Sequence, residues 1–122
     1  MIKLRKELLS LLNALHPRVY YQDAPDNAQY PYIVFDFPTS SFDGGGLEVV
    51  TVDIDGWARP KDGDTTELEL LMEKIKDIDK TTCSNDGFAA TFYLENRLAL
   101  TDDDKKIKRR KFIFQARVFD RS

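Results

Sequence analysis

Side chains that enzymes use most often are scarce in this chain. It contains one histidine, His16, and one cysteine, Cys83. A nucleophilic pair needs a base beside the thiol. However, His16 directly precedes a proline at the expected end of a helix, and Cys83 lies in a polar stretch without any sign of activation. We therefore predict no enzymatic activity, no catalytic residues and no cofactor.

Two groups of aspartates could bind a hard cation such as calcium or magnesium. Asp53 and Asp55 share one face of an expected strand, and Asp102, Asp103 and Asp104 form an acidic turn. Their spacing matches no EF-hand, so a solvated strand face and a solvated turn explain them better. The sequence contains no P-loop, dinucleotide fingerprint or zinc signature, and we predict no metal site.

A run of basic residues lies near the C-terminal end, where six of the seven residues from 105 to 111 are Lys or Arg. Three interpretations stay open: a solvated hairpin arm, a charged surface for protein assembly, and a nucleic-acid-binding surface. The run has no interleaved aromatic residues to stack on bases, which favours the first two. We expect one strongly cationic surface that meets an acidic protein surface or, alternatively, faces DNA. It would comprise Lys105, Lys106, Lys108, Arg109 and Arg110. Glutamate replacements there should leave the chain folded, because solvated charges add little stability.

Residues 38–46 form a second candidate surface, because they include three consecutive glycines beside an aromatic residue. Glycine has the most conformational freedom to lose on ordering, so we expect residues 43–46 to be mobile in the free chain. An aromatic residue is unexpected in a mere linker, and we predict that it contacts a neighbour only after assembly. The predicted partner-binding residues here are Phe42, Asp43, Gly44, Gly45 and Gly46.

Composition limits the class of protein further. A length of 122 residues suits one domain, residues 1–122, and a net charge of −3 argues against a generically basic nucleic-acid coat. A single cysteine excludes an internal disulfide framework. No apolar run approaches the roughly 18 residues that span a bilayer, and residues 1–15 lack the features of a signal peptide. We expect a chain made and used in a reducing cytoplasm, or in an assembly built there, without a membrane partner.

The periodicity of apolar residues predicts an α+β fold. Leucines spaced as in an amphipathic helix occupy residues 1–15, and a second helix with a buried stripe from Leu68 to Ile78 follows capping-box spacing at residues 64–67. Strands are expected at 19–21, 32–37, 47–58, 91–100 and 105–119, with residues 79–87 as a polar connection. Leu98 and Leu100 should face inward, and Asn96 suggests a bulge. The result is a mainly antiparallel sheet of four to five strands, with both helices on one face, in the order α-β-β-β-α-β-β.

Four segments together resemble the signature of a small siphophage neck family, the tail-completion or tail-terminator proteins, also labelled minor capsid or head–tail joining proteins. The segments are residues 19–25, 30–35, 50–57 and 68–75, in that order. Their signature positions are Ala24, Pro25, Pro31, Tyr32 and Trp57. We interpret Pro31 and Tyr32 as residues that serve the fold, because a proline without an N–H suits the start of a strand. The resemblance does not extend to the basic run.

This resemblance implies a non-enzymatic virion assembly protein. Members of such families form a hexameric ring that closes the end of the tail tube and joins the tail to the head connector. The implied partners are further copies of the chain, the major tail tube protein and a head connector or stopper, with passing contact to genomic DNA. The implied location is the tail–neck region of the virion, after assembly in the host cytoplasm. The alternatives are a head-side connector or stopper protein, and a small nucleic-acid-binding module that uses residues 105–111.

Overall fold

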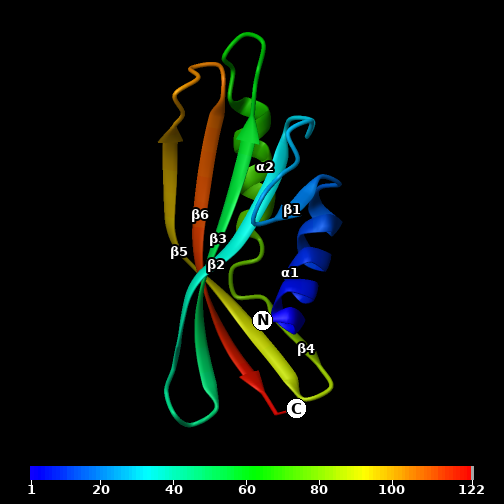
Figure 1. The fold of residues 1–122 in the computed structure, drawn as a ribbon, viewed down its shortest axis with the longest axis vertical. Coiled ribbons are helices and arrows are strands. Elements are labelled where there is room, and N and C mark those ends of the chain that lie inside the picture. The colour runs from blue at the N-terminus through cyan, green and yellow to red at the C-terminus, as the bar shows by residue number, and fades with distance from the viewer. Residues whose placement is uncertain (122) are drawn as a thin grey trace.

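The computed structural model describes residues 1–121 and confirms the α+β class, with two helices and one twisted sheet (Figure 1). The elements along the chain are α1 (Ile2–Leu15), β1 (Val19–Tyr21), β2 (Tyr32–Phe42), β3 (Leu47–Ala58), α2 (Thr66–Lys76), β4 (Thr82–Asn85), β5 (Phe88–Thr101) and β6 (Lys108–Asp120). Within the described residues, no helix is long and apolar enough to cross a membrane.

The sheet has six strands in the order β1-β2-β3-β6-β5-β4. All neighbours pair antiparallel except β1 and β2, which pair parallel. The prediction of four to five strands was therefore too low, because β4 lies within the stretch expected to be a polar connection. This strand is short and lies at an edge, and it buries only Cys83. Its sequence thus lacks the alternation that reveals a strand.

Both helices pack on the same face of the sheet, and together they enclose one core. Leu4, Leu8 and Leu12 of α1 are at most 1% exposed. They belong to the same buried cluster as α2 and the sheet residues that face the helices. The buried sheet residues alternate along each strand, for example Val50, Val52 and Ile54 in β3. No helix of the described residues packs on the opposite face, which we call the open face.

Gly56 allows α2 to approach the sheet closely. A Cβ atom at this position would lie 2.7 Å from the Met72 sulfur and 3.0 Å from Leu68 Cδ1. These distances are shorter than an ordinary van der Waals contact, so glycine is the residue that fits here without rearrangement. The close approach brings the buried side of α2 directly over β3.

A bulge in β5 changes which side chains face the core. The pairing of β5 with β6 shifts register between Leu94 and Asn96, which confirms the bulge suggested at Asn96. The extra residue reverses the alternation that follows, so Leu98 and Leu100 lie on the open face. The prediction that these two leucines face inward was wrong, and Leu98 is 40% exposed.

The turns of the two long hairpins lie at opposite ends of the molecule. The β3–β6 register pairs Leu47 with Phe119 at one end and Ala58 with Lys108 at the other. Eleven steps along a strand correspond to about 36 Å. In Figure 1 the β2–β3 turn is at the bottom and the β5–β6 turn is at the top. The two candidate surfaces from the sequence therefore lie far apart.

Candidate interaction surfaces

The first candidate surface is the hairpin tip, residues 42–46, between β2 and β3. β2 continues to Phe42, so the loop is shorter than the sequence suggested. Asp43 closes it: its Oδ1 accepts hydrogen bonds from the N–H groups of Gly45 (2.7 Å) and Leu47 (3.1 Å). The Asp43 N–H also donates to the Leu47 carbonyl oxygen at 3.1 Å. The tip is thus a defined turn, and its mobility in the free chain stays a prediction.

The same tip exposes the largest apolar side chain of the turn. Gly44 and Gly46 have φ values of 84° and 97°, a region that side chains other than glycine rarely adopt. These conformations bend the chain tightly behind Phe42, whose side chain is 74% exposed.

The second candidate surface, the basic run, is divided by the fold. Lys105 and Lys106 are exposed in the β5–β6 turn, where the Lys106 N–H donates to Asp104 Oδ1 at 2.9 Å. Arg110 faces the helices, and its Nε donates to Glu69 Oε1 at 2.7 Å. Arg109 faces the other way, onto the open face. The five residues predicted to form one cationic surface therefore lie on different sides, and the premise of solvated charges does not hold for Arg109 and Arg110.

A cluster of charged and aromatic side chains occupies the open face where β3 and β6 pair. We call it the open-face cluster, and it consists of Asp53, Asp55, Trp57, Arg109 and Lys111. Arg109 Nε donates to Asp55 Oδ2 at 3.0 Å, and its guanidinium lies over the Trp57 ring, 4.6 Å from the centre. Lys111 Nζ lies 3.2 Å from Asp53 Oδ2 and 3.9 Å from Asp55 Oδ1.

Sequence reasoning did not find this cluster, and it treated Asp55 as part of a solvated face. Asp55 is in fact 8% exposed. Burial raises the pKa of its carboxyl above the usual range, whereas the hydrogen bond and charge of Arg109 act in the opposite direction. The alternation of Asp53, Asp55 and Trp57 matches that of Arg109 and Lys111 on the next strand, and this signal could have revealed the pairing.

The two aspartate groups do not combine into a metal site. Asp53 and Asp55 are already paired with Lys111 and Arg109, while the acidic turn from Asp102 lies at the end of the β5–β6 hairpin. Among residues 1–121, no group of three or more His, Cys, Asp or Glu side chains is placed to hold a metal ion.

Aromatic rings extend the open-face cluster toward the edge of the sheet. Tyr32 stacks on Trp57 with 6.2 Å between ring centres and 17° between planes. Tyr20 and Tyr30 contact Tyr32 in turn, at 6.0 Å and 5.1 Å. Burial raises the pKa of Tyr32 to about 12. The result is a continuous surface of rings and paired charges with no helix over it.

The other signature positions serve the fold. The Pro31 carbonyl oxygen accepts hydrogen bonds from His16 Nε2 (2.8 Å) and Arg18 Nε (3.0 Å), which tie the start of β2 to the end of α1. The Tyr30–Pro31 peptide bond is cis. Pro25 accepts a hydrogen bond from the Ala28 N–H within the loop before β2, and Ala24 is half-buried there.

His16 and Cys83 do not form a nucleophilic pair. His16 bonds to the Pro31 carbonyl, and burial lowers its pKa. Cys83 faces the core opposite Ala90 in the register of β4 with β5. Burial raises the pKa of the Cys83 thiol, which keeps it protonated and unreactive near neutral pH.

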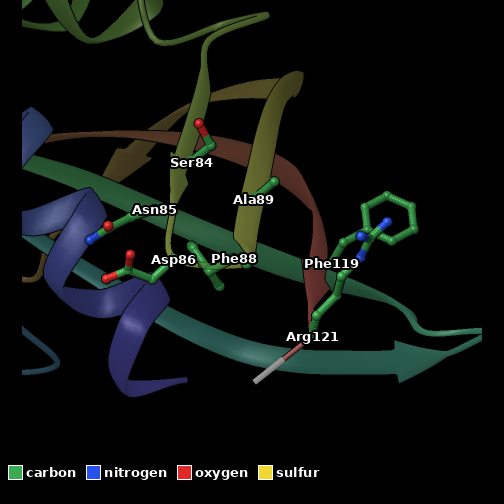
Figure 2. A pocket seen from close by; sticks show the side chains of 8 residues that line it. Ser84, Asn85, Asp86, Phe88, Ala89, Phe119 and Arg121 are labelled. Atoms are coloured by element: carbon green, nitrogen blue, oxygen red, sulfur yellow. The ribbon is translucent and has the colours of Figure 1, made fainter.

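A pocket of about 700 Å³ opens at the end of the sheet that also carries the hairpin tip. Figure 2 shows side chains from three neighbouring strands around it, including Ser84, Ala89 and Phe119. We call it the end pocket; its lining residues are Ser84, Asn85, Asp86, Gly87, Phe88, Ala89, Phe119 and Arg121. Phe119 is 51% exposed, so much of the lining is apolar surface in contact with solvent.

Comparison with known proteins shows a structure with a similar fold and the family to which the chain belongs. The structure is similar to a chain in the virion of a native gene transfer agent particle, with a TM-score of 0.68, 16% sequence identity, and coverage of 88% of this chain and 84% of that chain. No protein with a curated description matches the sequence. The family described as "Tail completion protein gp17" matches residues 3–118. Because this match extends over nearly the whole chain, the protein belongs to the tail completion protein gp17 family of bacteriophage virion structural proteins.

Proposed function

We propose that the chain assembles into a ring, expected to be hexameric, that closes the end of the tail tube and joins the tail to the head connector. The observation that carries this proposal is the open face. It presents large side chains without a covering layer, among them Trp57, Tyr93 and Leu98, the last two each 40% exposed. Large aromatic and aliphatic side chains that are gathered on one uncovered face support a protein interface there.

The shape of the molecule supports a position between two other assemblies. The hairpin tip and the β5–β6 turn lie at opposite ends of β3 and β6 (Figure 1). A subunit of this form can contact the major tail tube protein at one end and a head connector or stopper at the other. We propose that Lys105, Lys106 and Lys108 meet an acidic protein surface at their end, in the neck of a virion assembled in the host cytoplasm.

The charge distribution argues against nucleic-acid binding as the main function. Arg109, Arg110 and Lys111 are engaged by carboxylates of the same chain. Their charges are therefore largely neutralised before any phosphate approaches. With a net charge of −3, the chain lacks the broad basic surface that supplies most non-specific DNA affinity.

Deletion of the gene, followed by electron microscopy of the lysate, tests the proposal. We expect tails of uncontrolled length that are not attached to heads, and rescue by a plasmid copy of the gene. Unattached tails of normal length would instead favour a head-side connector or stopper. Normal particles from the deletion strain would overturn both functions.

The ring itself is tested separately by native mass spectrometry and class averages of the protein isolated from tails. We expect a closed ring of identical copies. A purely monomeric or dimeric species in finished tails would contradict the ring, whatever the deletion phenotype.

A further inference from the structure

Two complementary features lie at the same end of the sheet: the exposed aromatic side chain of the hairpin tip and the partly apolar end pocket. We propose that Phe42 of one copy inserts into the end pocket of the next copy around the ring. This inference rests on the proposed function, because it identifies the contact through which neighbouring subunits join.

The tip lies beside one edge of the sheet, whereas the pocket extends from β6 to the opposite edge at β4. One row of paired residues crosses five strands, from Phe42 through Glu48, Val118 and Ala90 to Cys83. Four interstrand spacings amount to about 19 Å. Phe42 cannot cross this distance without breaking the pairing of β2 with β3. Phe42 can therefore reach the β4 side of the pocket only from another copy of the chain.

The two features also lie at the same height along the strands. The β3–β6 register places Leu47, directly after the tip, opposite Phe119 in the pocket wall. A contact between unlike surfaces closes into a ring only if successive copies do not climb along the axis. A tip and a pocket at equal height along the strands satisfy this condition in a ring whose axis runs along the strands.

The chemistry of the two surfaces is complementary. The pocket offers Ala89 and the exposed Phe119 to an aromatic ring, and Arg121 also lines it. Within residues 1–121, Arg121 has no carboxylate partner in the same chain. Asp43 uses Oδ1 to close the turn, so its Oδ2 can pair with Arg121 of the neighbour once Phe42 is inserted.

The sheet edge beside Phe42 is accessible to a neighbour. β1 pairs only with Ile33, Val34 and Phe35 of β2. Among residues 1–121, the half of β2 that leads to the tip therefore has no strand on its outer side, and residues 39–42 are exposed. On the other edge, β4 is the last strand of the sheet and supplies Ser84 and Asn85 to the pocket.

Cysteine cross-linking in assembled tails tests the contact directly. In a Cys83→Ala background, we expect Phe42→Cys with Phe119→Cys to give a ladder of linked copies on a non-reducing gel, and a reductant should collapse it. The matched control pairs Phe42→Cys with Leu70→Cys, because Leu70 is 60% exposed but lies on α2. No ladder from the first pair in tails that contain rings would overturn the proposal. An equal ladder from the control, or a link from position 42 to the tube protein, would also overturn it.

Substitution of the inserted side chain provides the second measurement. Phe42→Ser should keep the wild-type free energy of unfolding, because the Phe42 side chain is 74% exposed. It should nevertheless reduce the yield of rings by about tenfold or more, as expected of an interface anchor. Phe42→Leu should retain most of the yield. If the wild type forms no ring, the proposed function fails. If the wild type forms rings and Phe42→Ser forms them equally well, this contact alone is excluded.

Discussion

Arg109 and Trp57 face each other across the β3–β6 pairing, with the guanidinium carbon 4.6 Å from the centre of the indole ring. The same guanidinium donates to Asp55, so one side chain joins a buried carboxylate to an aromatic surface. A residue that the sequence placed in a basic run expected to meet a partner is therefore engaged within its own chain, at the centre of the open face.

Arg109→Ala should destabilise the free chain. The substitution leaves Asp55 buried without its main partner and removes a cation–π contact. We expect a loss of about 2–4 kcal/mol in the free energy of unfolding, below the largest values for buried pairs because the Arg109 side chain is 27% exposed. Urea unfolding measures this.

Arg110→Ala is the matched control for that measurement. Its partner Glu69 is 52% exposed, so the ion pair is largely screened by solvent and should contribute less than about 1 kcal/mol. Equal losses for the two variants would show that the open-face cluster does not stabilise the chain more than a surface ion pair.

Stability should depend on the protonation of the only histidine. Burial lowers the pKa of His16 below 6.5, so the unfolded chain binds this proton at a higher pH than the folded chain does. The contribution of neutral His16 to the free energy of unfolding is therefore fully present above pH 6.5. It decreases as the pH falls through the pKa of His16 in the folded chain. An NMR titration gives the pKa of His16 directly. His16→Gln should remove this part of the pH dependence of urea unfolding, and an unchanged slope would contradict the assignment.

Gly56→Ala should destabilise the chain by about 1–3 kcal/mol through overpacking. The new methyl group would lie 2.7 Å from the Met72 sulfur, so α2 or its side chains must move. Met72→Ala should relieve this clash, and the double variant should lose less stability than the sum of the two single changes. A double-mutant cycle by urea unfolding measures the coupling, and additive losses would argue against the close approach.

Adjacent leucines on α2 should respond very differently to truncation. Leu71 is 6% exposed and Leu70 is 60% exposed. Leu71→Ala should cost about 2–5 kcal/mol, whereas Leu70→Ala should cost less than about 0.5 kcal/mol. Thermal unfolding of both variants checks which side of α2 packs on the sheet, and similar losses would show that the helix is rotated.

Regular alternation made much of this fold predictable. β3 matches its predicted bounds of 47–58, and Leu4, Leu8 and Leu12 of the leucine stripe of α1 are buried as expected. β4 was missed because a four-residue polar edge strand carries no such pattern. Leu98 and Leu100 were placed on the wrong face because one extra residue in β5 reverses every side chain after it.

The sequence predicted which stretches of the chain are candidates for interaction, but not which distant residues share one surface. Glycine content and the exposed aromatic residue identified the hairpin tip, because these are local properties. The open-face cluster joins Asp55 to Arg109, which are 54 positions apart. Only the strand register brings them together, and a charge count along the chain cannot supply that register. The end pocket likewise combines β4, β5 and β6.

The exposed lysines of the β5–β6 turn give the last prediction. Lys105→Glu with Lys106→Glu should leave the free energy of unfolding within about 0.5 kcal/mol of the wild type, because neither lysine has a carboxylate within salt-bridge distance in residues 1–121.

If these lysines meet an acidic protein surface, the double variant should produce tails that fail to cap or to join heads. If they face DNA in the ring lumen, joining should be normal and genome retention or delivery should be impaired. Counting joined particles by electron microscopy and measuring packaged DNA separates the two outcomes. Lys61→Glu, an exposed charge reversal in the β3–α2 connection, is the matched control, and it should leave both quantities unchanged. A double variant that is normal in every step would remove this turn from the list of interaction surfaces and leave it a solvated hairpin end.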